Sequence, residues 1–346
     1  MSGNIRFSVI CPFYNSETYL EEAIRSVAAQ SFGGWELILI DDGSRDTGSQ
    51  IAARYEVTDK RIHFLRSEHH GTYHARKAGA QASAGEYILF LDSDDLLAAD
   101  ALETLSRALE GFPADALIFN WDRLDAEGKT FPAVDTTIRQ PEEITGPQSI
   151  LKRLYLESDI GDFLCRAVFR HELLDHLGGG EPPSAHSAED TYMSFHLLSA
   201  AETVLLLTDV LYHYRVNPSS ITNNLTPEDY LGRSLTISHV FCSIDSRFPE
   251  LLDKGFDVYV TETFFAYMIH VPQMHREKAP YVRYKAVCGE LRTDRFYMSR
   301  LIKYRSDRPK LNIITWLFRY RMYFALFMML RLWSILLIAA GRRDKE

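Results

Sequence analysis

Seven residues, Leu89-Phe-Leu-Asp92-Ser93-Asp94-Asp95, decide the fold of this chain. They complete an apolar run that predicts a buried strand over Tyr87–Leu91, and they place three carboxylates at its carboxyl end. In open α/β sheets, ligands bind at the carboxyl ends of the strands. Carboxylate oxygens are also ligands that Mg²⁺ takes beside substrate phosphates. Taken alone, the segment is also compatible with an acidic turn that caps the next helix.

Strand and helix patterns alternate over the first half of the chain. The apolar runs predict strands over Arg6–Cys11, Trp35–Ile40, Ile62–Arg66, Tyr87–Leu91 and Ala116–Trp121. The amphipathic runs predict helices over Leu20–Gln30, Thr47–Tyr55 and Tyr73–Ala82. This alternation is typical of α/β proteins with a Rossmann-like, mostly parallel sheet flanked by helices. Two further strands are predicted over Val204–Leu207 and Leu211–Arg215.

Two more predicted strands end in polar groups. One is the strand in Phe7-Ser-Val-Ile-Cys-Pro-Phe-Tyr-Asn15, and the other lies in Glu36-Leu-Ile-Leu-Ile-Asp41-Asp42-Gly-Ser44. Because the carboxyl ends of parallel strands share one edge of a sheet, we expect three strand ends to converge on one crevice.

The composition limits the class of protein. The chain has 346 residues, of which 46% are hydrophobic and 25% charged, as in ordinary globular proteins. A formal net charge of −9 argues against nucleic acid as a partner, because polyanion binding draws on clustered Lys and Arg. The four scattered cysteines include no C-x-x-C pair and fit a reducing cytosol. The first ten residues lack the features of a secretory signal, so we expect a cytoplasmic protein.

Four segments together resemble a known family. They are Cys11-Pro-Phe-Tyr-Asn-Ser-Glu17, Asp41-Asp-Gly-Ser-Arg-Asp46, Gly71 to Gly79, and Gly85-Glu-Tyr-Ile-Leu-Phe-Leu-Asp-Ser-Asp-Asp95. Their order and spacing resemble those of the inverting family 2 glycosyltransferases, over about residues 5 to 220. The resemblance implies a GT-A fold, a nucleotide-sugar donor, a saccharide or glycolipid acceptor, and a divalent metal, Mn²⁺ or Mg²⁺. We expect a catalytic domain over 1–225, a helical region over 226–310 and a basic, apolar C-terminal helix over 311–346.

The resemblance assigns one group of residues to the nucleotide-sugar donor. It comprises Pro12, Tyr14, Asn15, Glu17, Asp41, Asp42, Arg76, Asp92 and Ser93. Asp41 and Asp42 would contact uracil and ribose, which fits the acceptor-only chemistry of a carboxylate. Asp94 would hold the metal ion. Uridine diphosphate is the donor nucleotide that the resemblance implies.

The segment around Arg76 departs from the family pattern at one position. Lys77 stands where the family has Asn, which leaves open whether this helix treats the donor in the usual way. Arg76 could bind a nucleotide oxygen through its planar fork of donors. His69, His70 and His74 also lie nearby, but a phosphate-bound hard cation prefers oxygen ligands.

A second pair of carboxylates lies further along the chain. Glu189-Asp190 resembles the family's Glu-Asp element before a helix, whose second carboxylate is the catalytic base. The resemblance therefore assigns Asp190 as the base that takes the proton of the acceptor hydroxyl. Glu189 would bind the acceptor or a backbone group. Read alone, two acidic residues at a helix start are more often a cap that the helix dipole favours.

Downstream, Leu211-Tyr-His-Tyr-Arg-Val-Asn-Pro-Ser-Ser-Ile-Thr222 also matches the family pattern. Arg215 and Ser220 would hold the diphosphate or close the site. A sheet strand with surface polar groups explains the same residues equally well.

The end of the chain combines apolar and basic character. Tyr323–Ala340 has Arg331 as its only charge, and Lys303–Glu346 holds ten Lys or Arg against three Asp or Glu. Eighteen residues lie near the short limit for a membrane span. We favour a helix that lies in the membrane interface, peripheral on the cytoplasmic face. A packed C-terminal helix and a true span are the alternatives.

Two other functions fit parts of the pattern. A nucleotidyltransferase would also use acidic metal ligands on such a sheet, but the chain shows no Gly-rich N-terminal loop with a basic residue for a triphosphate. A non-catalytic nucleotide-sugar binding protein would not need both Asp94 and Asp190, and both are present. The sequence leaves the donor sugar, the acceptor and the metal undecided, and it is compatible with a homo-oligomer.

Overall fold

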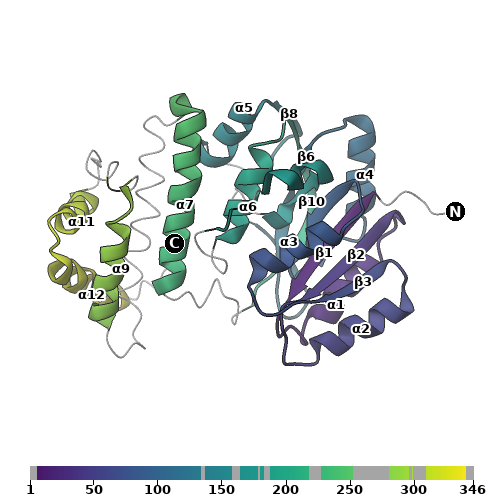
Figure 1. Cartoon of the computed structure of the whole chain (residues 1–346), viewed down its shortest axis with the longest axis horizontal. Coiled ribbons are helices and arrows are strands. Elements are labelled where there is room, and N and C mark those ends of the chain that lie inside the picture. The colour runs from purple at the N-terminus through teal and green to yellow at the C-terminus, as the bar shows by residue number, and fades with distance from the viewer. Residues whose placement is uncertain are drawn as a thin grey trace. The chain divides into compact units, whose positions relative to one another are not determined.

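The computed structural model of the chain describes residues 6–133, 137–157, 164–177, 180–182, 188–217, 227–251, 280–295, 298 and 309–339. The chain divides into two compact units, Met1–Ser220 and Ile221–Glu346. The described strands all belong to the first unit, and the described part of the second unit is helical (Figure 1).

Within the described residues, the first unit is built on one ten-stranded sheet. Its strands are β1 (Phe7–Phe13), β2 (Trp35–Asp41), β3 (Ile62–Arg66), β4 (Tyr87–Phe90), β5 (Leu96–Leu97), β6 (Ala116–Leu124), β7 (Thr130–Pro132), β8 (Glu142–Thr145), β9 (Ala167–Arg170) and β10 (Thr203–Arg215). They follow the order β3-β2-β1-β4-β9-β6-β10-β5, with β7 paired to β6 and β8 to β10. The prediction of an α/β sheet flanked by helices is confirmed.

The sheet changes character across its width. β3, β2, β1 and β4 run parallel, as in a Rossmann-like half sheet. β9 is antiparallel to both of its neighbours, β4 and β6, so β6 again runs in the direction of β4. β10 is parallel to β6. The carboxyl ends of β1, β2, β4, β6 and β10 therefore point to the same edge. Among the described strands four pairs are parallel and five antiparallel, so the sheet is mixed and the expectation of a mostly parallel sheet holds only for β3, β2, β1 and β4.

Six helices are described in the first unit. They are α1 (Leu20–Ala28), α2 (Gly48–Thr58), α3 (Thr72–Ala82), α4 (Ala101–Gly111), α5 (Pro147–Leu151) and α6 (Glu189–Leu198). Short helical turns of other types are η1 (Lys152–Leu156), η2 (Leu164–Arg166) and η3 (His171–Leu177). The three predicted helices of the first half are present, but α1 ends at Ala28 before the predicted Gln30, and α2 continues beyond Tyr55 to Thr58.

The two strands predicted over Val204–Leu207 and Leu211–Arg215 form the single strand β10. Its pairing with β6 is irregular between Leu206 and Val210 and again between Val210 and Tyr212. The prediction of two strands was wrong, because a bulge absorbs the intervening polar residues without ending the strand.

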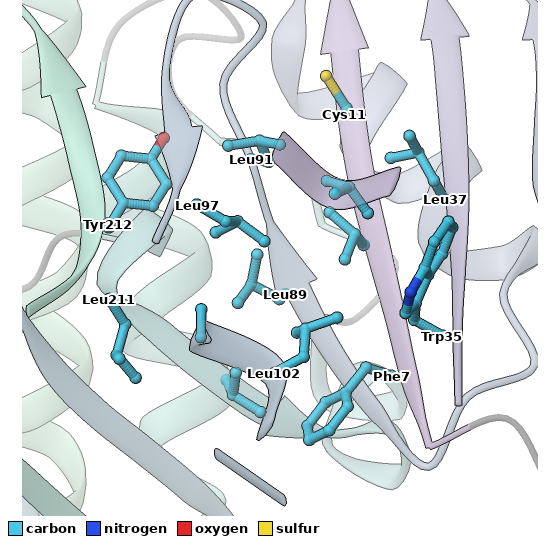
Figure 2. Close-up of a cluster of buried hydrophobic side chains, with 14 of the residues drawn as sticks. Phe7, Cys11, Trp35, Leu37, Leu89, Leu91, Leu97, Leu102, Leu211 and Tyr212 are labelled. Carbon is cyan, nitrogen blue, oxygen red and sulfur yellow. The ribbon is translucent and has the colours of Figure 1, made fainter. Parts of the chain in front are cut away.

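The core of the first unit lies between one face of the sheet and helices α1, α2 and α4. Figure 2 shows Phe7, Trp35, Leu89 and Leu211 from four strands pointing into it. Burying one such side chain stabilises the fold by about 1.5–3 kcal/mol. The core thus holds the strand ends, where the polar segments lie, on a rigid base.

Helix α3 packs on β1 and β2 from the opposite side of the sheet, and a glycine permits its close approach. A Cβ atom on Gly79 would lie 2.6 Å from Ile10 Cγ2 and 2.7 Å from Ile40 Cδ1. These residues alternate with the core residues of their strands, so they face α3. The contact sets the distance of α3, and of the side chains it carries, from the sheet.

The second unit is helical in its described part. It contains α7 (Pro227–Arg247), η5 (Pro249–Leu251), α9 (Pro280–Leu291), α11 (Pro309–Arg319) and α12 (Tyr323–Ala339). Helix α12 packs on α9 through Phe327, whose ring lies 5.4 Å from that of Tyr284, and Tyr323 lies 5.9 Å from Phe318 of α11. Among the described residues, none of the helices combines the length and the apolar character that a membrane crossing requires.

Candidate active site

The acidic turn after β4 is held in place by its last carboxylate. Asp95 is 1% exposed, and its two oxygens accept hydrogen bonds from the Tyr212 hydroxyl and the Arg215 backbone N–H, each at 2.7 Å. Burial, together with the charges of Asp92 and Asp94, raises the pKa of the Asp95 carboxyl well above its usual range. Asp95 therefore joins the acidic turn to β10 and is not exposed to a ligand.

Asp94 is the least compensated carboxylate of the turn. Its side chain accepts a long hydrogen bond from Asn217 Nδ2 at 3.4 Å, and its own backbone N–H and the charge of Arg215 also favour the ionised form. Burial and the charge of Asp92 raise the pKa of the Asp94 carboxyl. A bound divalent cation would offset both effects, and a carboxylate is an oxygen donor of the type that Mg²⁺ and Mn²⁺ take. The position therefore fits the metal ligand expected from the sequence, although the described residues contain no group of three or more His, Cys, Asp and Glu arranged to hold an ion.

Arg76 connects the two acidic segments that the sequence singled out. It lies on α3 and is 4% exposed. Its Nη2 donates to Asp92 Oδ1 at 2.7 Å and its Nη1 to Glu189 Oε1 at 3.0 Å. Burial lowers the pKa of Arg76, but the charges of Asp92, Glu189 and Asp190 outweigh burial and raise it, so the guanidinium stays charged. One buried cation thus bridges the end of β4 to the start of α6.

The start of α6 presents the second pair of carboxylates. Ala188 precedes the helix with φ 62°, a left-handed conformation that is uncommon for a residue with a side chain. Glu189 faces Arg76, and burial together with Asp190 raises its pKa to about 7 against the charge of Arg76. Asp190 is half-buried, and its Oδ1 accepts the Thr191 N–H at 2.8 Å, which leaves its second oxygen for other partners.

Two loops at the ends of β1 and β2 are joined by reciprocal hydrogen bonds. Asn15 N–H donates to Ser44 Oγ at 3.0 Å, and Asn15 Oδ1 accepts the Arg45 N–H at 2.9 Å. Glu17 Oε2 accepts both the N–H and the hydroxyl of Thr47, at 3.0 and 2.7 Å. These bonds lower the pKa of Glu17. Asn15 and Glu17, predicted to lie beside the donor, thus also shape the loop pair.

The Asp41 carboxylate forms its hydrogen bonds with the segment that follows β2. It is 1% exposed, and it accepts hydrogen bonds from the Ser49 hydroxyl and from the Ser44 N–H, the latter at 2.7 Å. Burial raises the pKa of Asp41, but these hydrogen bonds and the charge of Arg66 outweigh it and hold the pKa below its usual value. The geometry makes Asp41 a support of the loop that follows β2.

Asp42 binds the segment that leads into α3. Its Oδ1 accepts the His70 N–H at 2.9 Å, its Oδ2 accepts the Gly71 N–H at 3.0 Å, and His69 Nδ1 lies 2.8 Å from Oδ2. The His69 ring stacks on Tyr14, with centroids 4.2 Å apart and planes 19° apart. Tyr14 is 41% exposed, so this aromatic pair forms part of the surface at the sheet edge.

Lys77, which stands where the family pattern has Asn, has its ammonium group 5.8 Å from the centroid of the Tyr73 ring.

Arg215 is directed into the protein. It is 5% exposed; its Nε donates to the Asp94 carbonyl at 2.8 Å, and its Nη2 donates to Glu22 Oε2 at 2.7 Å. Its guanidinium also lies 4.6 Å from the Tyr19 ring centroid. Arg215 therefore braces the backbone of the acidic turn. Ser220, predicted beside it, lies outside the described residues.

The predicted site residues fall into two connected groups. The first, which we name the carboxylate cluster, comprises Arg76, Asp92, Asp94, Glu189, Asp190 and Arg215. The second, which we name the loop group, comprises Tyr14, Asn15, Glu17, Asp41 and Asp42. A hydrogen bond of 2.8 Å between the hydroxyls of Ser16 and Ser93 connects them. Pro12 is buried within β1, so its side chain supports the surface from below.

The sequence analysis did not predict the roles that several residues have in the site. Asp95 and Tyr212 form its buried anchor, Glu22 balances Arg215, His69 stacks on Tyr14, and Asn217 contacts Asp94. Asn217 could have been noticed, because it follows Arg215 by two residues in the same strand-to-loop segment. Glu22 gave no signal, since an acidic residue in the first turn of a helix is ordinary.

Comparison with known proteins gives one family and one fold. The model of glycosyl transferase family 2 matches residues 8–178. A Bacillus subtilis (strain 168) relative named as the teichuronic acid biosynthesis glycosyltransferase TuaG is 30% identical over 218 residues, which cover 63% of this chain and 81% of TuaG. Two further relatives from the same organism, each 30% identical, are matched over 62% of their own length.

Solved structures of similar fold extend over almost the whole chain. S. aureus TarS 1–349 in complex with UDP-GlcNAc has a TM-score of 0.67 and 19% identity, covering 98% of this chain and 93% of that one. The mannosyltransferase PcManGT from Pyrobaculum calidifontis, in complex with GDP-Man and Mn²⁺, has a TM-score of 0.51 and 17% identity, covering 96% of this chain and 88% of that one. The expected GT-A fold is thereby confirmed.

Proposed function

The chain belongs to glycosyl transferase family 2, and on that premise we propose that it is an inverting glycosyltransferase that moves a sugar from a uridine diphosphate donor to an acceptor hydroxyl. One observation carries the proposal: Arg76 brings Asp92 of the acidic turn and Glu189 of the Glu-Asp element into one cluster. In the chain, Arg76 and Glu189 are 113 residues apart. Donor and acceptor chemistry need groups from both segments in one place.

The donor nucleotide is assigned to the loop group. The exposed ring of Tyr14 offers a face for a base, and Asp42 fixes the backbone of the segment beside it. TarS, which shares the fold, has been solved with UDP-GlcNAc. Asn15, Glu17 and Asp41 act mainly by holding this loop pair rigid, which lowers the entropic cost of ordering a ligand.

Asp94 is assigned to a divalent cation, Mn²⁺ or Mg²⁺. Its weakly compensated carboxylate supports this choice, and PcManGT, of similar fold, has been solved with Mn²⁺. When bound, the cation supplies positive charge that stabilises the departing diphosphate. Asp95, Tyr212 and Arg215 keep the Asp94 turn in position.

Asp190 is assigned as the catalytic base. Its carboxylate takes the proton of the acceptor hydroxyl while that oxygen bonds to the anomeric carbon of the sugar and the bond to the diphosphate breaks. Attack on the face opposite the leaving group inverts the anomeric configuration. Glu189, held by Arg76, is assigned to acceptor binding, and its pKa near 7 allows it to donate or accept a hydrogen bond close to neutral pH.

We assign the acceptor to the saccharides and glycolipids of the cell envelope. The relative TuaG is named for the biosynthesis of teichuronic acid. The catalytic domain is proposed to span residues 1–225, followed by a helical region over 226–310 and the basic, apolar C-terminal segment. The single helix expected over 311–346 is divided in its described part into α11 and α12 by a turn at residues 320–322. The basic, apolar end of the chain supports a peripheral position on the cytoplasmic side of a membrane.

Calorimetric titration tests this function. UDP, GDP and dTDP are titrated with and without Mn²⁺ into the intact protein, into Asp94→Ala, and into Asp100→Ala as the control. Asp100 is also an acidic residue near the turn, but it is exposed and its side chain makes no cap hydrogen bond. Mn²⁺-dependent UDP binding that only Asp94→Ala loses supports the proposal. No binding of any nucleotide diphosphate by folded protein would overturn it.

A further inference from the structure

Helices α11 and α12 carry apolar side chains that stay largely exposed beside the described residues of the second unit, although the Phe324 ring lies 5.2 Å from that of Tyr281 on α9. On α12, Tyr323, Leu326, Phe327 and Leu330 are buried at the spacing of one helix face. A soluble helix of this kind normally turns polar residues outward. Here the outward residues are again apolar: Phe324 is 59% exposed, Met328 48% and Leu332 59%.

Helix α11 repeats this pattern. It buries Ile314, Leu317 and Phe318, yet Ile313 is 51% exposed and Trp316 50% exposed. Tyr320, directly after the helix, is 60% exposed, and its ring lies 5.1 Å from that of Trp316. We name these outward residues of the two helices the apolar rows; they are Ile313, Trp316, Tyr320, Phe324, Met328 and Leu332.

The charge of this segment differs from that of the whole protein. Residues 309–339 contain Lys310, Arg319, Arg321 and Arg331 and no acidic residue, whereas the chain as a whole has a net charge of −9. Arg321 is exposed in the turn between α11 and α12. Exposed apolar and aromatic side chains beside basic ones complement a surface that is apolar inside and anionic outside.

We propose that the apolar rows dock into the interfacial layer of an anionic lipid bilayer, with Arg321 at the headgroups. The aromatic residues Trp316 and Tyr320 suit this layer, where rings with a polar end are favoured. In a dimer formed through this surface, the basic segments of the two copies would face each other and repel. An anionic bilayer would instead attract the basic segment. This inference rests on the peripheral membrane position in the proposed function and names the surface that would make the contact, but it does not require donor or acceptor binding.

Vesicle co-sedimentation of the full chain tests the inference. Phosphatidylcholine vesicles are compared with vesicles that also contain phosphatidylglycerol. We expect binding to the anionic vesicles, weakened at least about tenfold by the combined change Trp316→Ala, Phe324→Ala and Leu332→Ala. Arg321→Gln should weaken it roughly fivefold. The control, Val57→Ala with Phe131→Ala, removes exposed apolar side chains of the first unit and should change nothing.

Three readouts keep the outcomes distinct. Tryptophan fluorescence should shift to shorter wavelength with anionic vesicles, and Trp316→Phe, which leaves Trp35, Trp121 and Trp333 in place, should reduce the shift but not the sedimentation. Circular dichroism and UDP binding in solution verify that each variant is folded and separate a failure of docking from a failure of the proposed function. Absence of binding to both vesicles, unchanged binding by the triple variant, or self-association that only the triple variant loses in sedimentation velocity would each overturn the inference.

Discussion

Replacing Arg76 by Gln is the most direct test of the carboxylate cluster that contains Arg76, Asp92 and Glu189. The change removes the buried cation that bridges Asp92 and Glu189 at 2.7 and 3.0 Å. Breaking a fully buried ion pair costs about 3–5 kcal/mol. Asp92 remains 35% exposed and is partly solvated, and Glu189 can take up a proton, so the expected loss is smaller, about 2–3 kcal/mol.

The same change should be visible in thermal unfolding. For a unit of this size a loss of about 2–3 kcal/mol lowers Tm by roughly 5–10 °C. Arg76→Lys keeps the charge but not the two-pronged geometry, so it should recover part of the loss. Arg107→Gln is the control, because Arg107 forms an exposed pair with Glu103 within one helix, worth well under about 1 kcal/mol.

Transfer activity should fall together with stability. Without Arg76, Glu189 and the Asp92 turn lose their common partner, so the residues proposed to bind the donor and those proposed to bind the acceptor both lose their position. We expect a decrease in kcat that exceeds the change in KM, measured below the unfolding transition of the variant. If the free energy of unfolding of Arg76→Gln lies within about 1 kcal/mol of the parent's and its kcat is retained, Arg76 does not hold Asp92 and Glu189 together.

Four further changes have expected outcomes. Asp190→Asn should lower kcat about 10²–10⁴-fold while UDP binding by calorimetry is retained, and near-normal turnover would remove Asp190 as the base. Asp94→Asn should abolish the Mn²⁺ dependence of UDP binding. Without metal it should raise Tm, because burial raises the pKa of Asp94 and the buried charge destabilises the folded protein. An unchanged Mn²⁺ response would argue against Asp94 as a metal ligand. Gly79→Ala should lower the free energy of unfolding in urea by about 1–3 kcal/mol, because the added methyl group would collide with Ile10 and Ile40. An unchanged free energy would contradict the tight packing of α3. Glu189 has a higher pKa in the folded protein, about 7, than in the unfolded chain, so its protonation contributes to the free energy of unfolding at low pH. That contribution should be lost as the pH rises from the unfolded pKa to about 7. Glu189→Gln should therefore reduce the slope of Tm against pH over this range.

Local sequence patterns predicted most strands and helices of the first half of the chain. The strands β2 and β3 begin and end within one residue of the predicted limits, because apolar runs between turn residues are a local property. The family resemblance rested on four motifs whose order along the chain needs no folding to be seen. β9 gave no such signal: its four residues are too few to show a period, and its place between β4 and β6 depends on the whole topology.

The sequence by itself determined the reaction class, the fold class and the residue types that surround the site. Only the tertiary structure decided what those residues do for one another: Asp95 is an anchor, Arg215 is directed inward, and Arg76 joins Asp92 to Glu189. The physical reason is that a carboxylate or a guanidinium has the same identity in the sequence whether it faces water, a ligand or a buried partner. Burial and partners far apart in the chain then set its charge state and its role.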